Sequence, residues 1–221
     1  MKIALFDFCE TLANFQTADA YVRFVQANSP VSHRFTKLSY DLLNRSHLLG
    51  IPRRLFPKSS MDKKWIMRQM TGRTEDEMTL LALKYYNERV RPALIPEVVG
   101  ELKAKQKEGY KIYLISAGYS IYLQYFAKEF AVDGVIATKI AFDNGVCLGR
   151  FDGPDCMFSH KIDYIKRGVP DNHFEEWFAY SDSITDLPML ELVGHPVVIS
   201  KGKSQKWAEQ KGFEQIIWNK K

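Results

Sequence analysis

The chain has 221 residues, of which 46% are hydrophobic and 26% are charged, a composition typical of a soluble protein with one large domain, or with one domain and an insertion. The formal net charge of +5 favours anionic ligands such as phosphorylated metabolites. Because no arginine-rich stripe or recognised nucleic-acid-binding motif accompanies this charge, we expect no nucleic-acid partner.

The first predicted element is a short buried strand, formed by the apolar run from Ile3 to Phe6. It ends at a carboxylate, Asp7, in the position where ligands bind in open α/β sheets, although an aspartate there can also cap a turn. The residues before Asp7 are too few for a signal peptide or a membrane span, and the three cysteines are sparse and lack metal-ligand spacing. We therefore expect a cytoplasmic protein with no membrane partner.

A long helical stretch follows this strand. Apolar residues recur in it at helical spacing, and Thr74–Glu77 match a capping box that begins a helix. The pattern predicts an all-helical cap domain over 14–91, inserted between the two parts of an α/β core, 1–13 and 92–221. The cap helices are expected over 17–27, 35–49, from 59 or 60 to 70, and 74–90, with a loop over 51–58.

From residue 97 onwards, predicted helices alternate with predicted strands. The dipeptide Asn144-Gly145 between two apolar runs is the strongest short signal for a hairpin. The alternation predicts a Rossmann-like, doubly wound α/β core, with a mostly parallel sheet and helices on both faces. Helices are expected over 97–108, 119–130, 161–167, 187–193 and 205–210. Strands are expected over 111–115, 135–137, 177–180, 196–199 and 216–218, and the hairpin over 139–150.

Four polar residues follow predicted strands, namely Asp7, Ser116, Asp182 and Asp186, and Lys161 stands at the start of a predicted helix. Because the carboxyl ends of parallel strands meet at one edge of a sheet, we expect these side chains to converge. Carboxylates suit Mg²⁺ or act as covalent nucleophiles, and a lysine and a serine can bind the oxygens of a transferring phosphoryl group. Each residue alone could be a turn residue, a helix cap or a solvated lysine, but together they predict phosphoryl transfer.

Four segments resemble the motifs of phosphatases of the haloacid dehalogenase (HAD) superfamily. They are Phe6–Leu12, Leu114–Gly118, Ser159–Lys161 and Ser181–Leu190, of which the last is the most specific. Within the superfamily, the chain is most similar to the phosphoserine-phosphatase-like branch, in which a helical cap follows the first motif. The resemblance implies a HAD-like core with this cap, and the activity of a phosphoric monoester hydrolase.

The resemblance also implies a role for each candidate residue. Asp7 would be the nucleophile and a Mg²⁺ ligand. The backbone carbonyl of Cys9 and the carboxylate of Asp182 would complete the protein side of the metal site, and Asp186 would support it. The implied phosphate-binding residues are Ser116, Ala117 and Lys161.

Position 9 departs from the family pattern. The phosphatases carry an aspartate two residues after the nucleophile, which protonates the leaving alcohol and then activates water, whereas this chain has Cys9. A thiol has a pKa near ~8.5 and is a weak hydrogen-bond donor, and general acid–base catalysis is typically worth about 10²–10⁴ in rate. Proton transfer would fall to Cys9 itself, to the adjacent Glu10 or to the substrate.

Three functions are compatible with this pattern. The first is a Mg²⁺-dependent phosphatase, slowed by Cys9, whose cap closes over a small phosphorylated metabolite. The second is a catalytically impaired phosphate-binding protein. The third is different chemistry with the same nucleophile, as in phosphonatases and dehalogenases, which also lack the second aspartate. The retained pair of Asp182 and Asp186 favours a metal enzyme over a dehalogenase.

The sequence says less about the part of the substrate that carries the phosphate group. Gln16 stands where phosphoserine phosphatases of this branch carry a glutamate that binds the substrate amine, so the resemblance does not extend to strict phosphoserine specificity. Cationic cap side chains either contact an anionic substrate or form a solvated face. The cationic candidates are Arg45, Arg53, Arg54 and Lys58. We expect a monomer or a homodimer.

Overall fold

The structure of the protein, a computed structural model, describes residues 1–29 and 61–219. The helix expected over 35–49 and the loop expected over 51–58 lie outside the described residues, as do the four cationic cap candidates. Within the described ranges, the structure contains no helix with the length and apolar character needed to cross a membrane.

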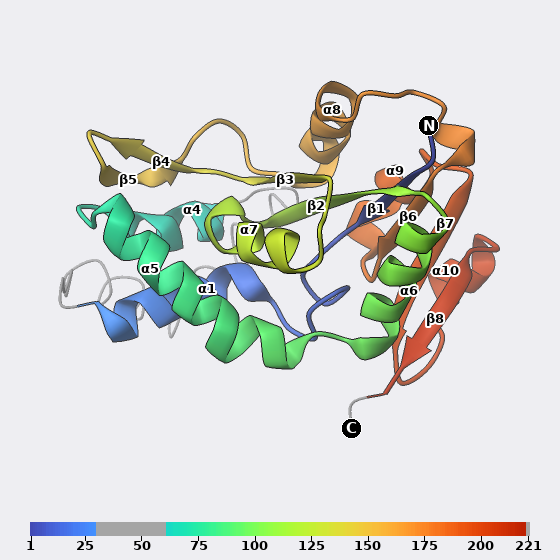
Figure 1. Ribbon diagram of the computed structural model, residues 1–221, viewed down its shortest axis with the longest axis horizontal. Coiled ribbons are helices and arrows are strands. Elements are labelled where there is room, and N and C mark those ends of the chain that lie inside the picture. The colour runs from blue at the N-terminus through green and yellow to red at the C-terminus, as the bar shows by residue number, and fades with distance from the viewer. Residues whose placement is uncertain (30–60, 220–221) are drawn as a thin grey trace.

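The core is a parallel sheet flanked by helices, which confirms the predicted fold class (Figure 1). In the described ranges it has six strands in the order β3-β2-β1-β6-β7-β8, and each neighbouring pair is parallel. Because β1 lies between β2 and β6, the residue that follows β1 emerges between the ends of both neighbours. The strands are β1 (Ile3–Phe6), β2 (Lys111–Tyr119), β3 (Gly134–Thr138), β6 (Phe178–Ser181), β7 (His195–Lys201) and β8 (Glu214–Trp218).

Alternate residues of β1 enter two different hydrophobic cores. Ala4 and Phe6 belong to the core that α6 and α7 cover, and Ile3 and Leu5 belong to the core that α8, α9 and α10 cover. Successive side chains of a strand point to opposite faces, so a strand buried on both faces needs the continuous apolar run that this sequence has. The helices are α6 (Pro96–Lys107), α7 (Ser120–Glu129), α8 (Phe158–Gly168), α9 (Leu187–Leu190) and α10 (Lys206–Gln210).

β2 is longer than predicted, because it does not end before Ser116. Its pairing with β3 shifts between Ser116, which faces Ala137, and Tyr119, which faces Thr138. Residues 117 and 118 therefore form a bulge, in which the strand bends without ending. The helix expected from residue 119 accordingly begins one residue later, with α7.

The inserted stretch is mainly helical in its described part (Figure 1). Thr74 caps α5 (Glu75–Tyr85) by accepting a hydrogen bond from the amide of Glu77 at 3.2 Å, as the capping-box pattern predicts. The base of the stretch is closed where the amide of Ile95 donates to the carbonyl of Leu12 at 2.9 Å. The other elements are α1 (Thr17–Asn28), α4 (Met61–Arg68), a π-helical turn (Tyr86–Val90) and a 3-10 turn (Arg91–Ala93).

The predicted hairpin forms, and it contacts the inserted stretch (Figure 1). Asn144 and Gly145 at its turn have φ angles of 45° and 74°, the left-handed conformation that these two residue types favour in tight hairpins. The amide of Cys147 donates to the carbonyl of Arg73 at 2.8 Å. The second half of the chain is thereby tied to the inserted helices. The hairpin strands are β4 (Ile140–Asp143) and β5 (Val146–Phe151).

Candidate active site

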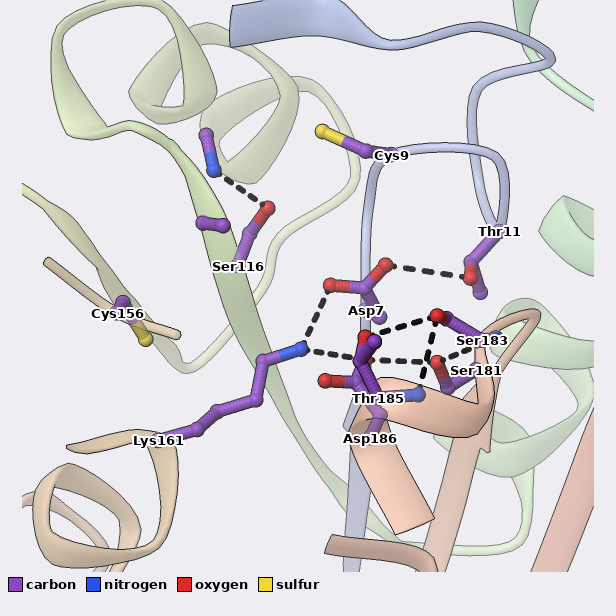
Figure 2. Close-up of polar contacts among 12 residues, drawn as sticks. Asp7, Cys9, Thr11, Ser116, Cys156, Lys161, Ser181, Ser183, Thr185 and Asp186 are labelled. Carbon is purple, nitrogen blue, oxygen red and sulfur yellow. Dashed lines mark hydrogen bonds and ion pairs between the residues drawn. The ribbon is translucent and has the colours of Figure 1, made fainter. Parts of the chain in front are cut away.

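Three of the predicted site residues meet at the end of β1 (Figure 2). Asp7 is held there because its amide donates to the carbonyl of Tyr180 at 2.9 Å, and its side chain is buried. Nζ of Lys161, on α8, lies 2.9 Å from Oδ1 of Asp7 and 2.6 Å from Oδ2 of Asp186. The hydroxyl of Ser181 donates to the same Oδ2 at 2.7 Å. The structure thus joins the end of β1, α8, the end of β6 and the 3-10 turn (Ile184–Asp186) that follows β6.

The charges in this cluster are buried and compensate each other. Burial raises the pKa of Asp7 to about 6, and the ammonium of Lys161 opposes this rise. Burial also disfavours the ammonium, but the carboxylates of Asp186 and Asp7 outweigh that effect and hold the pKa of Lys161 above its ordinary value. Lys161 is therefore cationic at neutral pH, and its ammonium favours the ionised form of Asp7, which is the form able to act as a nucleophile or a metal ligand.

Thr11 links Asp7 to Asp182. Its Oγ1 lies 3.3 Å from Oδ2 of Asp7 and 3.0 Å from Oδ1 of Asp182, and it accepts a hydrogen bond from the amide of Asp182 at 3.0 Å. A hydroxyl has one proton to donate, so the two carboxylates share it. The sequence prediction missed Thr11, although it lies within the first motif, four residues after Asp7.

Asp7 and Asp182 fit a hard divalent cation. Burial and the charge of Asp7 raise the pKa of Asp182 to about 7, an unfavourable pairing that a cation bound by carboxylate oxygens would relieve. Asp186 instead uses Oδ2 to anchor Lys161. Among the described residues, no three His, Cys, Asp or Glu side chains form a metal-binding group by themselves. A coordination shell would combine the carboxylates of Asp7 and Asp182 with other oxygen ligands, such as a backbone carbonyl or water.

Ser116 lies on the same side of Asp7 as Lys161 in Figure 2. Its Oγ is buried and accepts a hydrogen bond from the amide of Gly118 at 3.0 Å, which leaves its own proton for another acceptor. A Cβ atom at Gly118 would lie 2.5 Å from Oη of Tyr122, so position 118 has no room for a side chain. The bulge of β2 thus places a serine donor beside the nucleophile.

Cys9 is directed away from the Asp7 carboxylate (Figure 2). Its Sγ lies 3.0 Å from Oγ1 of Thr17, which lies 2.7 Å from Oη of Tyr122. Burial, reinforced by the charge of Asp7, raises the pKa of the Cys9 thiol. The thiol is therefore protonated at neutral pH, and it belongs to a hydrogen-bonded chain that connects the nucleophile turn to α1 and α7.

Glu10 lies on the outer side of the same turn. It is exposed, with a left-handed φ of 59°, and its carboxylate accepts a hydrogen bond from Nε2 of Gln16. Its partner, Gln16, stands at the position where the phosphoserine phosphatases that this chain resembles bind the substrate amine. Glu10 is open to water, unlike the buried Asp7.

One cation of the inserted helices reaches the site, and the sequence prediction missed it. Lys63 on α4 is buried, and its ammonium donates to the carbonyl of Ala117 and, at 3.2 Å, to Oγ1 of Thr138. The next residue, Lys64, is exposed. The signal was present in the helical spacing, because Lys63 stands three and four residues before Ile66 and Met67 and so shares the buried face of α4.

Comparisons with known proteins place these motifs in a family. The sequence model of haloacid dehalogenase-like hydrolases matches residues 4–191. A phosphoserine phosphatase from Lactococcus lactis subsp. lactis is 27% identical over 97 residues, which cover 43% of this chain and 45% of that protein, and so less than half of its length. A histidinol-phosphatase from Neisseria meningitidis serogroup C is 21% identical over 221 residues, with 96% of each chain covered.

A crystal structure of a protein of unknown function from Bordetella pertussis Tohama I has the same fold. Its TM-score is 0.79, with 20% sequence identity and 97% of each chain covered.

Proposed function

Because the chain belongs to the family of haloacid dehalogenase-like hydrolases, we propose that it is a Mg²⁺-dependent phosphatase that hydrolyses a small phosphorylated metabolite. The observation that carries the proposal is the buried Asp7 carboxylate, held by Lys161 and paired through Thr11 with Asp182. The relatives named phosphoserine phosphatase and histidinol-phosphatase support the substrate class.

Asp7 is the proposed nucleophile. One of its oxygens attacks phosphorus and the ester P–O bond breaks, which gives an aspartyl-phosphate and, once the departing oxygen takes up a proton, the alcohol. Water then cleaves the acyl-phosphate and restores the carboxylate. Lys161 fixes the orientation of Asp7 and offsets the negative charge of the phosphoryl oxygens, to which Ser116 donates. A Mg²⁺ ion held by Asp7 and Asp182 would offset the same charge.

We assign a positioning role to Cys9 and propose that Glu10 transfers the proton through a water molecule, from the solvent side of the nucleophile turn. The thiol of Cys9 is hydrogen-bonded to Thr17, and its raised pKa keeps it protonated at neutral pH and makes it a weak acid. Glu10 lies on the nucleophile turn, is exposed to water, and its charge adds to the rise in the pKa of Asp182. The same observation on Cys9 favours a second candidate function, a phosphate-binding protein with little turnover.

A phosphatase assay separates the two functions. The purified protein with MgCl₂ would be given a panel of phosphomonoesters that includes phosphoserine and histidinol phosphate, beside Asp7→Asn and a sample treated with a chelator. We expect phosphate release by the wild type only, and only with the metal present. Equal release by Asp7→Asn would contradict the proposal, and phosphate binding without release would support the second function.

A further inference from the structure

Lys63 connects the inserted helices to the phosphate-binding end of β2. Its side chain leaves α4 and is 8% exposed, and its ammonium donates to the carbonyl of Ala117 and to the hydroxyl of Thr138. The ammonium also lies over the ring of Tyr119 at 5.2 Å and over that of Phe151 at 5.3 Å. One cap residue therefore contacts the ends of β2 and β3 and the hairpin.

Thr138 extends this contact into the core. Its Oγ1 lies 3.2 Å from the carbonyl of Ala117 and accepts a hydrogen bond from the amide of Cys156 at 3.1 Å. The charge of Asp155, which is itself buried, favours the ammonium against the cost of burial. A buried lysine is costly compared with an apolar side chain of similar length, so packing alone does not explain the presence of Lys63.

The acceptor of Lys63 belongs to the peptide unit that supports Ser116. The carbonyl of Ala117 and the amide of Gly118 are two ends of one planar peptide. Lys63 binds the oxygen end, and the N–H end donates to Oγ of Ser116 at 3.0 Å. Because the unit is planar, the direction of the carbonyl fixes the direction of the N–H group. Tyr122 closes the space beside Gly118.

We propose that Lys63 is a positioning residue through which the inserted helices assemble the phosphate site: by holding the Ala117–Gly118 peptide, it orients the hydroxyl of Ser116 towards the substrate phosphate. This inference rests on the proposed role of Ser116 in phosphate binding. Docking of α4 and binding of phosphate then stabilise each other, because coupling between two equilibria is reciprocal.

A double-mutant cycle tests the route through Ser116. The dissociation constant of inorganic phosphate would be measured by calorimetry, with MgCl₂ present, for the wild type, Lys63→Met, Ser116→Ala and the double variant. We expect each single variant to bind phosphate about tenfold more weakly, within the usual range of coupling between sites. The double variant is expected to bind as Ser116→Ala does, since residues that act through each other are not additive.

Lys64→Met is the matched control, because it removes the same charge from the adjacent, exposed position of the same helix. We expect it to leave phosphate affinity unchanged. Circular dichroism checks that each variant is folded, and Lys63→Gln, which is polar but too short to reach Ala117, replaces Lys63→Met if the latter does not fold.

If Ser116→Ala weakens phosphate binding, two results would overturn the inference about Lys63 without affecting the role of Ser116. They are unchanged phosphate affinity in the Lys63 variants, and additive losses of affinity in the double variant. Unchanged affinity in Ser116→Ala would instead remove the proposed role of Ser116 itself, and the inference with it.

Discussion

Charge compensation at Asp7 comes from Lys161, a residue 154 positions away in the sequence. The ammonium lies between the carboxylates of Asp7 and Asp186 in a site from which water is nearly excluded. Electrostatic interactions are strong in such an environment, and an uncompensated charge there is costly. On the other side of the nucleophile turn, Cys9 carries no charge and makes a hydrogen bond to Thr17. Asp7 is thus stabilised by an opposite charge, whereas Cys9 is stabilised by a hydrogen bond.

Lys161→Met is expected to destabilise the fold and abolish phosphatase activity. It leaves Asp7 and Asp186 as buried carboxylates without their cation, and the removal of one partner from a buried pair typically costs about 3–5 kcal/mol. Urea denaturation without metal measures the free energy of unfolding. Lys166→Met, at an exposed position of the same helix, is the control and should stay within about 0.5 kcal/mol of the wild type. Equal stability of the two variants would contradict this account of the cluster.

Cys9→Asp is expected to raise kcat by an order of magnitude or more, since general acid–base catalysis is typically worth about 10²–10⁴ in rate. Cys9→Ser keeps a hydrogen-bonding partner for Thr17 but adds no carboxylate, so its kcat should remain near that of the wild type. Steady-state kinetics on the best substrate of the panel measure both. No gain in Cys9→Asp would mean that proton transfer does not limit turnover.

Glu10→Gln is expected to lower kcat in the wild-type background and to have less effect in Cys9→Asp, where the new carboxylate can transfer the proton. The change removes acidity at Glu10 and keeps an amide that can still bond to Gln16. A Glu10→Gln enzyme as fast as the wild type would remove Glu10 from the proton-transfer step.

At the scale of secondary-structure elements, the bulge of β2 positions the phosphate-binding residues. Ser116 remains in register with β3, and the shift that follows brings Gly118 against Tyr122. The bulge therefore orients a serine hydroxyl without ending the strand. The turn after β1 acts in the same way, because it places Asp7 and Thr11 on one buried side and Glu10 outside.

Gly118→Ala is expected to weaken phosphate binding and destabilise the fold, because its Cβ would lie 2.5 Å from Oη of Tyr122. Overpacking of this kind typically costs about 1–3 kcal/mol. Removing the hydroxyl in Gly118→Ala/Tyr122→Phe should recover part of the loss. Gly100→Ala on α6 meets no atom within 4 Å and should instead stabilise the protein by roughly 0.5–1 kcal/mol. Phosphate titration and thermal unfolding distinguish the two glycines.

At the scale of the whole molecule, the inserted helices and the sheet share one hydrophobic core. Met78 and Tyr85 of α5 belong to the same cluster as Phe6 of β1 and Tyr122 of α7. The rings of Tyr85 and Tyr122 are 5.3 Å apart, with an interplanar angle of 73°, an edge-to-face arrangement that stabilises aromatic pairs. The hairpin adds two backbone hydrogen bonds, from the amide of Cys147 to the carbonyl of Arg73 and from the amide of Gly72 to the carbonyl of Cys147.

This shared core predicts that the protein unfolds in one cooperative transition. Burial of apolar surface that belongs to both parts couples their stabilities, and domains that share a core do not unfold separately. Tryptophan fluorescence and far-ultraviolet circular dichroism should give coincident urea transitions. Two separated transitions would show that the inserted helices are stable without the core, or the core without them.

The sequence was sufficient to determine the fold class, because its information is local and periodic. The continuous run Ile3–Phe6 predicts a doubly buried strand, and Asn144-Gly145 predicts the hairpin turn. The convergence of Asp7, Lys161 and Asp186 also follows from sequence, since each lies at the end of an element that the parallel topology brings to one edge.

Only the tertiary structure decided how the remaining side chains are used. The length of β2 depends on its pairing with β3, which the residues around Ser116 do not encode locally. The direction of Cys9 depends on Thr17 and Tyr122, and the contact of Lys63 with the carbonyl of Ala117 depends on where α4 meets β2. These properties arise from contacts between segments distant in sequence, and such contacts have no periodic pattern from which to predict them.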